Sequence, residues 1–263
     1  MGVLNATPDS FYGASRTPEK RACLEAAMRL AEEGADILDI GGQSTRPGSD
    51  PVSEEEELRR VLPVVEELSR RLSIPISVDT DKAGVARRAR EAGASVLNDV
   101  RALRGEGMVE AALEYEAVVL MHMSGASPKE MQNDPFYEDV TEEVKEFFGE
   151  RTRKYMQAGG DAARLLYDPG IGFGKTTEHN LTLLRRIEAF VKMGPVVLGV
   201  SRKSFIGKIL GSEDNPLPPE DRLEGSLAVA CMAAIQGVRI LRVHDVGATR
   251  RALRVMEAVA VGA

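Results

Sequence analysis

Cationic and proton-donating residues follow several short apolar runs of this sequence, and such groups are suited to binding an anion. They are Arg46, Lys203, Arg242 and His244. The stretch "RVHDVGATRR" combines an arginine, a histidine and a predicted helix start, which together favour a phosphate site. Basic groups there would also neutralise charge that develops on a departing anion.

Hydrogen-bond acceptors and amides follow other apolar runs. They are Asp79, Asn98 and Asp168. A buried carboxylate pairs well with a ligand edge that carries two adjacent donors. These residues therefore indicate an uncharged nitrogen heterocycle, bound beside the anionic group that leaves during the reaction.

The stretch "DPGIGFGKTT" (168–177) resembles a phosphate-binding P-loop but has the wrong spacing. A P-loop requires glycine five positions before its Gly-Lys-Thr glycine, and Pro169 stands there instead. Proline has no backbone N–H to donate to a phosphate. We therefore expect Asp168 to be the functional residue here, and Lys175 to contribute least.

The elements that position these residues alternate between strand and helix. Short runs rich in Val, Ile and Leu are typical of parallel strands covered on both faces. The predicted strands are Met1–Asn5, Asp36–Ile40, Ile74–Val78, Ser95–Asn98, Ala117–Met121, Arg164–Tyr167, Val196–Val200 and Arg239–Val243. The predicted helices cover about 18–33, 54–71, 82–91, 106–115, 138–158, 177–191, 203–210 with 220–236, and 245–260.

Eight strand–helix units predict an α/β fold, a (β/α)8 TIM barrel that forms a single domain over residues 1–263. A doubly wound sheet is the alternative. Connections from helix to strand are short, whereas several from strand to helix are long, including 6–17, 41–53 and 122–137. Long loops on one face of a barrel indicate that the active site lies there.

A weak repeat supports this unit. "EEGADILD", "EAGASVLN" and "IQGVRILR" each end a helix with glycine and carry a polar residue five positions later. Glycine accepts the left-handed conformation that turns a helix into a strand. The polar residues Asp39, Asn98 and Arg242 are therefore predicted at the far ends of their strands.

Several polar residues also have a purely structural interpretation. Asp81 and Asp245 are expected to cap the helices that follow them. His122 follows a strand alone and does not by itself indicate a site, and His179 is expected to be solvated at a helix start.

The composition is that of an intracellular globular protein. The chain has 263 residues, 29% charged, with a net charge of -7, which argues against bulk binding to nucleic acid. No apolar run reaches the roughly 18 residues of a membrane span. Cys23 and Cys231 fall within apolar helical patterns and are interpreted as reduced core residues, so we expect a cytoplasmic enzyme.

Seven motifs together resemble the bacterial dihydropteroate synthase family, in the same order and over nearly the whole chain. They are "MGVLNATPDSF", "DIGGQSTRPGS", "SVDT", "LNDV", "DPGIGFGK", "SRKSFIG" and "RVHD". The resemblance implies a TIM barrel and a homodimer. It also implies condensation of 6-hydroxymethyl-7,8-dihydropterin diphosphate with p-aminobenzoate, giving 7,8-dihydropteroate and pyrophosphate in folate biosynthesis.

The resemblance also implies a role for particular residues. Catalysis would rest on Asp168, Lys203, Arg242 and His244. The pterin would be held by Asp79, Asn98, Asp168, Lys203 and Arg46, and the diphosphate by Asn5, Arg46, Arg242 and His244. A Mg2+ ion would bind Asn5 and the phosphate oxygens. The aminobenzoate pocket would be lined by Phe11, Thr45, Pro47, Phe173, Lys203 and Ser204.

The sequence departs from the family pattern in three ways. Gly13 replaces an aspartate of the first loop, Gln43 replaces a glutamate of the second, and the chain starts inside the first strand, where relatives have a preceding segment. The alternatives are a methyltetrahydrofolate-dependent corrinoid methyltransferase, which needs no diphosphate site, and a non-catalytic homologue. Arg242, His244 and "STRPG" argue against the first, whereas Asn5, Arg46, Lys203 and His244 argue against the second.

Overall fold

Strands and helices alternate throughout the computed structural model, which describes residues 1–6, 16–44, 50–125 and 135–261. Among these residues the strands are β1 (Gly2–Asn5), β2 (Leu38–Gly41), β3 (Ile76–Asp79), β4 (Val96–Asp99), β5 (Ala117–Met121), β6 (Leu165–Asp168), β7 (Val197–Gly199) and β8 (Ile240–Arg242). Each overlaps a predicted strand, with ends that differ by at most two residues, the usual uncertainty of an element boundary.

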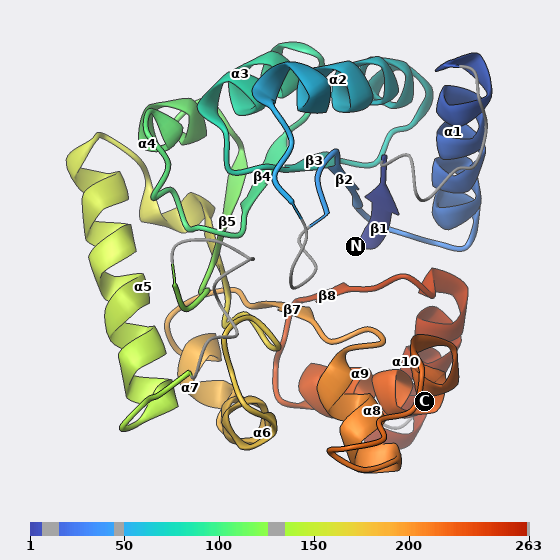
Figure 1. Ribbon diagram of the computed structural model, residues 1–263, viewed down its shortest axis with the longest axis vertical. Coiled ribbons are helices and arrows are strands. Elements are labelled where there is room, and N and C mark those ends of the chain that lie inside the picture. Colours follow the sequence, from blue (N-terminus) through green and yellow to red (C-terminus); the bar gives the residue numbers. More distant parts are fainter. Residues whose placement is uncertain (7–15, 45–49, 126–134, 262–263) are drawn as a thin grey trace.

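The strands close into a parallel barrel with helices outside it (Figure 1). β1 to β6 pair in sequential order, and β7 pairs separately with β8. Single β-bridges join these two arcs at two seams, β6–β7 and β8–β1. The Tyr167 N–H donates to the Pro195 carbonyl at 3.0 Å across the first seam, and the Val3 N–H donates to the Val243 carbonyl at 3.0 Å across the second. The predicted (β/α)8 barrel is confirmed.

The helices follow the strands in the predicted order. They are α1 (Arg16–Glu32), α2 (Glu54–Arg71), α3 (Ala83–Glu91), α4 (Met108–Ala112), α5 (Val140–Gln157), α6 (Thr177–Arg185), α7 (Glu188–Val191), α8 (Ser204–Leu210), α9 (Leu223–Ile235) and α10 (Val246–Val261), with short 3-10 turns η2 (Ala162–Arg164) and η3 (Pro219–Arg222). The predicted helix over 177–191 is interrupted at Arg186 and Ile187. Ile187 and Phe190 beside the break are both fully buried, so core packing overrides local helical preference there.

Apolar residues fill the lower part of the barrel, and polar residues occupy its carboxyl end. Val96, Val119 and Val197 form one buried cluster there. Asn98 lies two positions after Val96 on the same strand, and so its side chain points into the same interior, one layer higher. The barrel therefore has an apolar floor beneath a polar mouth, the usual position of an active site in this fold.

Glycines turn the helices into strands, as the internal repeat predicts. Gly34, Gly93 and Gly237 follow α1, α3 and α9 with φ angles of 95°, 110° and 93°, a conformation that strains other residues. Asp39, Asn98 and Arg242 each lie five residues after one of these glycines. This spacing places all three side chains in the barrel interior.

Candidate active site

The three polar residues of the repeat meet in one hydrogen-bonded cluster inside the barrel. The carboxylate of Asp39, which is fully buried, accepts hydrogen bonds from Asn98 Nδ2 at 3.1 Å and Arg242 Nε at 2.6 Å. It also accepts from the hydroxyl of Ser77 at 2.6 Å. Arg242 Nη2 in turn donates to Asp79 at 2.8 Å. The cluster therefore links β2, β3, β4 and β8, and fixes how Asp79 and Asn98 are presented.

Two carboxylates share one guanidinium in this cluster, and the pKa of Asp79 reflects the imbalance. Burial raises the pKa of Asp79 to about 8, and the nearby charge of Arg242 only partly opposes this. Burial alone would lower the pKa of Arg242, but Asp39 and Asp79 raise it above its ordinary value. Asp79 can thus hold or release a proton near neutral pH, which suits a residue that contacts ring nitrogens.

Asp168 ends β6 beneath a tightly turned glycine segment. Its carboxylate accepts a hydrogen bond from the Gly170 N–H at 2.8 Å, and burial raises its pKa while Lys203 opposes the shift. Gly170, Gly172 and Gly174 have φ angles of 68°, 84° and 63°. A Cβ atom on Gly170 would lie 1.8 Å from the carbonyl oxygen of His122, so only glycine fits there.

Lys203 reaches the same segment from the connection between β7 and α8. Its Nζ donates to the carbonyl of Ile171 and lies 4.4 Å from the centre of the Phe173 ring. Burial lowers the pKa of Lys203 to about 8, although Asp168 attracts the charged form. The structure therefore brings Asp168, Phe173 and Lys203 together, as the sequence predicts, with Ser204 next in the chain at the start of α8.

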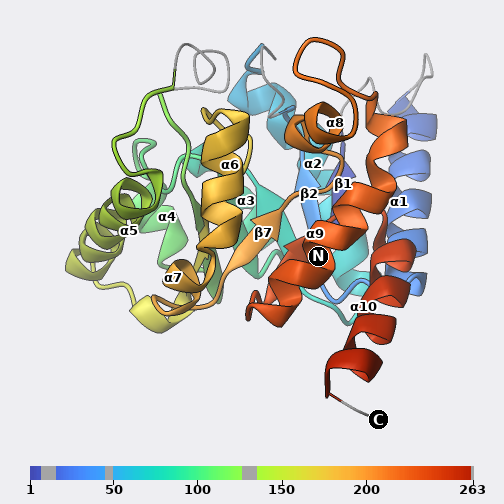
Figure 2. The ribbon, with the colours of Figure 1, turned by 90° about the horizontal axis from the view of Figure 1, so that it is seen from below.

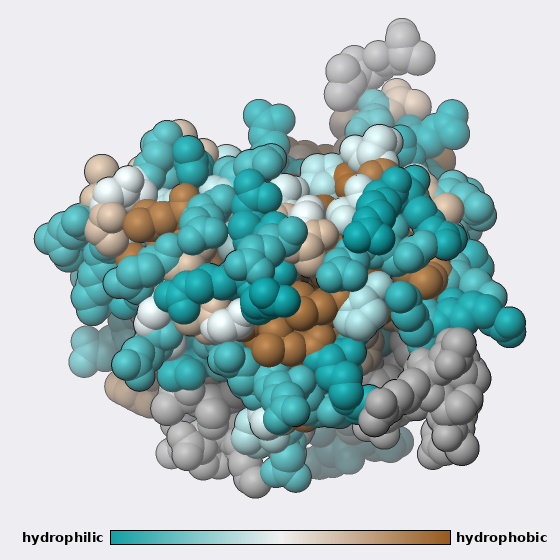
Figure 3. Space-filling model, turned by 90° about the horizontal axis from the view of Figure 1, so that it is seen from above, coloured by the Kyte–Doolittle hydropathy of each residue, from teal (hydrophilic) through white to brown (hydrophobic). Residues whose placement is uncertain are grey.

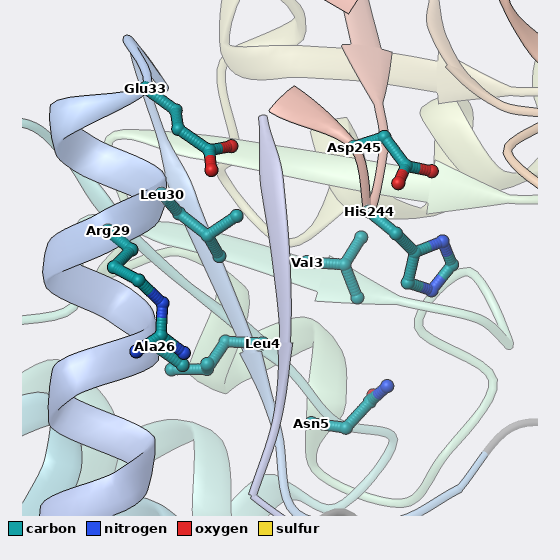
Figure 4. Close-up of a pocket in the computed structure, with 9 residues that line it drawn as sticks. All are labelled: Val3, Leu4, Asn5, Ala26, Arg29, Leu30, Glu33, His244 and Asp245. Carbon is teal, nitrogen blue, oxygen red and sulfur yellow. The ribbon is translucent and has the colours of Figure 1, made fainter. Parts of the chain in front are cut away.

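Asn5 and His244 lie on one side of β1, opposite the residues of α1 (Figure 4). They line part of a cavity of about 320 Å³ that extends around this strand. The ring of His244 is exposed, and its Nδ1 lies 3.1 Å from the hydroxyl of Ser201. Arg242, only two residues earlier, is directed into the carboxylate cluster instead.

Two predicted helix caps have other partners. α3 is preceded by Lys82, which makes no side-chain cap bond. Asp81 Oδ2 lies 3.5 Å from Arg101 Nη1. Both carboxylate oxygens of Asp245 pair with Arg202, each at 2.8 Å. The prediction that Asp81 caps α3 is wrong, because the residue after it occupies the cap position. Asp245 directly precedes α10, where its carbonyl accepts from the Thr249 N–H, and its side chain ties the β7 connection to that of β8.

Further residues take part that the sequence interpretation did not include in the site. Asp39 and Ser77 orient the pterin candidates, and Ser201 contacts His244. The internal repeat already contained a signal for Asp39. It places Asp39 near the end of β2 in the same way that it places Asn98 and Arg242 near the ends of β4 and β8. The predicted residues Phe11, Thr45, Arg46 and Pro47 lie outside the described residues.

The fold and site can be set beside known proteins. Residues 1–244 match the family described as pterin binding enzyme. The chain belongs to this family. Among curated relatives of this pterin-binding enzyme, a dihydropteroate synthase of Escherichia coli (strain K12) is 47% identical over 260 residues, covering 98% of this chain and 90% of the relative. One from Haemophilus influenzae is 44% identical, with 99% and 93% covered.

Solved structures agree with this assignment. The Yersinia pestis dihydropteroate synthase with a sulfonamide drug complex has a TM-score of 0.91 and 43% identity, covering 100% of this pterin-binding enzyme and 94% of that chain. The Xanthomonas albilineans enzyme in complex with 7,8-dihydropteroate has a TM-score of 0.87 and 45% identity, with 98% and 92% covered. The resemblance to dihydropteroate synthases in the seven motifs is confirmed.

Proposed function

We propose that this pterin-binding enzyme condenses 6-hydroxymethyl-7,8-dihydropterin diphosphate with p-aminobenzoate to give 7,8-dihydropteroate and pyrophosphate. The observation that carries the proposal is the polar mouth, where Asp79, Asn98, Asp168 and Lys203 surround an interior floored by apolar residues. Such a site binds a flat, uncharged heterocycle with several ring donors. The relatives named above are transferases of this type.

The proposed chemistry breaks the bond between the pterin methylene carbon and its diphosphate oxygen. The electron pair leaves with pyrophosphate, and an electron-rich dihydropterin stabilises the cation that remains. The buried carboxylate of Asp168 favours that cation through the ring N–H groups. The aniline nitrogen of p-aminobenzoate then forms the new C–N bond and loses a proton, and an aniline needs no strong base to attack.

We infer that the diphosphate lies at the mouth between Asn5, His244 and Arg242, with Arg46 beside it. Arg242 uses Nε and Nη2 on the carboxylates of Asp39 and Asp79. Its Nη1 makes no hydrogen bond within the described part of the chain, and we propose that it donates to the diphosphate. The same guanidinium would then connect the pterin half of the site to the anion half.

A Mg2+ ion fits this arrangement. Within the described ranges no cluster of three or more His, Cys, Asp or Glu residues could hold a metal ion. Mg2+, however, is commonly bound by one or two protein oxygens together with substrate phosphates. The amide oxygen of Asn5, at the mouth beside His244, would be such a ligand. The ion would neutralise negative charge on the departing pyrophosphate.

The proposed reaction predicts that pyrophosphate release requires both p-aminobenzoate and Mg2+. The protein would be mixed with the pterin diphosphate, and pyrophosphate and dihydropteroate would be measured with and without each component and with EDTA. We expect equal amounts of the two products, and loss of both on chelation. Pyrophosphate released without dihydropteroate would contradict the condensation, and transfer of a methyl group from methyltetrahydrofolate would favour the methyltransferase alternative.

We infer a homodimer built on α9 and α10, which lie side by side on the outside of the barrel (Figure 2). Met232, Ile235, Val255 and Val259 on these helices are 40%, 65%, 66% and 81% exposed. The face of the molecule in Figure 3, by contrast, is largely hydrophilic. Exposed apolar residues gathered on neighbouring helices are typical of an interface between subunits.

The dimer proposal predicts that a charge on α9 separates the subunits. Ile235→Glu would place a carboxylate in the interface, at a position where the isolated subunit is solvated. Sedimentation equilibrium is expected to show the wild-type chain at twice its monomer mass and the variant at the monomer mass. Val52→Glu, far from these helices, is the control. A wild-type chain that is monomeric at micromolar concentration would contradict the proposal.

We infer a cytoplasmic location from the state of the two cysteines. Cys23, which is buried, and Cys231 are free thiols, and burial raises the pKa of Cys23 to about 12, so that it stays protonated. Reduced cysteines are usual in the cytoplasm. Separately, the described helices include none with the length and hydrophobicity needed to cross a membrane.

A further inference from the structure

Lys175 is a buried lysine to which the proposed reaction gives no role. Its side chain is only 5% exposed, at the end of the glycine segment that follows Asp168. Its Nζ lies 2.9 Å from His122 Nδ1 and donates to the carbonyls of Gly170 and Phe173, each at 3.0 Å. Burying an ammonium group is costly unless all its protons find acceptors. Here four acceptors surround it, two from the segment itself and two from His122, whose backbone carbonyl lies 3.4 Å from Nζ.

The protonation of the pair follows from its surroundings. Burial lowers the pKa of His122 well below its usual value, and the charges of Lys175 and Arg104 add to this effect. His122 is therefore neutral, and its Nδ1 can accept a hydrogen bond from the ammonium of Lys175. Burial also lowers the pKa of Lys175, to about 7, with Lys203 acting in the same direction and Asp168 opposing it.

The segment that Lys175 holds carries two features of the mouth. The carbonyls of Gly170 and Phe173 are directed to Lys175, whereas the carbonyl of Ile171, between them, accepts from Lys203. The ring of Phe173 meanwhile lies against the Lys203 ammonium. The left-handed glycines give the segment little conformational preference of its own. Hydrogen bonds from Gly170 to Asp168 and from Gly172 to Asn180 hold its N–H groups, and Lys175 is the cation to which two of its carbonyls are directed.

We propose that Lys175 is a positioning residue, whose ammonium holds the carbonyls of Gly170 and Phe173 so that Phe173 and Lys203 form the pocket for p-aminobenzoate. The assignment of that ligand rests on the proposed function. His122, which directly follows β5, is a neutral acceptor for the same ammonium group. Asp79 and Asn98 lie on β3 and β4, with β5 between these strands and β6, so pterin binding there is expected to depend little on Lys175.

The test is Lys175→Ala with chemical rescue. We expect KM for p-aminobenzoate to rise by about 10- to 100-fold, the range that follows a misplacement of about 1 Å. Affinity for the pterin, measured by calorimetry, is expected to change much less. Added n-butylammonium, which restores a cation in the vacated space, should recover much of the loss, whereas n-butanol, which fills that space without a charge, should not. Lys192→Ala, an exposed lysine, is the control.

The outcomes separate this proposal from the proposed function. A wild-type protein that forms no dihydropteroate contradicts the function, whereas an active wild type with an unchanged variant contradicts the role of Lys175. Equal rescue by n-butanol would mean that Lys175 only fills space, and would also overturn the proposal. Lys175→Met, which keeps the length of the side chain but cannot donate, is to be measured in parallel in case the alanine variant does not fold. An unchanged KM in a folded methionine variant would count equally against it.

Discussion

Lys203→Ala is expected to abolish most turnover while the barrel remains folded. Lys203 is the cation that most opposes the raised pKa of Asp168, and it donates to the Ile171 carbonyl. It lies on the connection after β7 rather than in the apolar core. Its removal takes a preorganised charge from the site, a change that typically costs about 10²- to 10³-fold in kcat. Steady-state kinetics and pterin calorimetry would measure the loss, and circular dichroism the fold.

The pH dependence of the wild-type enzyme independently tests whether the charge of Lys203 is needed. Because the pKa of Lys203 is lowered to about 8, its ammonium form is lost as the pH rises through that value. At saturating p-aminobenzoate, kcat should therefore fall on the alkaline side of about pH 8, and Lys203→Arg, if active, should lose this limb of the kcat profile. Lys208→Ala on α8 is a matched control, since that lysine pairs with Glu213 at the surface. Wild-type turnover in Lys203→Ala would remove Lys203 from the site.

Arg242→Met is expected to lower the free energy of unfolding by about 3–5 kcal/mol at neutral pH, the usual cost of leaving a buried charge without its partner. When ionised, the carboxylates of Asp39 and Asp79 both depend on Arg242 to balance their negative charge. The pterin site would be disordered as well, because the cluster also holds Asn98. Urea unfolding at several pH values would measure the effect.

The sign of the pH dependence distinguishes this cause from a simple loss of packing. Burial already raises the pKa of Asp79 to about 8, and removing Arg242 would raise it further. A carboxyl whose pKa is raised in the folded state is tolerated at low pH, and destabilises the fold progressively as the pH rises from its unfolded pKa toward the folded one. The deficit of Arg242→Met should thus be smaller at pH 5 than at pH 8. Arg239→Met, an exposed neighbour, is the control, and an equal deficit at both values would exclude the electrostatic explanation.

The sequence was sufficient to predict the barrel and the ends of its strands, because both follow from local patterns. Gly34, Gly93 and Gly237 mark the turns, and a fixed spacing of five residues then locates Asp39, Asn98 and Arg242. The identities of hydrogen-bond partners were not accessible in this way. That Arg242 would meet Asp39 and Asp79 depends on closing the barrel between residues about 200 positions apart.

Buried charges were the hardest features to interpret. Lys175 was expected to contribute least because its motif failed as a P-loop, yet its burial and its contact with His122 arise from two neighbouring strand ends. Asp245 was predicted only as the capping residue before a helix, whereas its side chain also pairs with Arg202 from the β7 connection. In each case the local sequence offers a plausible solvated role, and only tertiary packing supplies the partner.

Several carboxylates and cations of the site come from different arcs of the barrel. Asp39, Asp79 and Asp168 belong to the six-strand arc, whereas Lys203 and Arg242 project from the β7–β8 arc or its connection. Single bridges join the arcs at the backbone, so side-chain pairs across the mouth carry part of the attachment. A substrate that contacts acids on one arc and bases on the other would link the two arcs. Binding at the site would then reduce the motion of the arcs relative to each other and make the whole barrel more rigid.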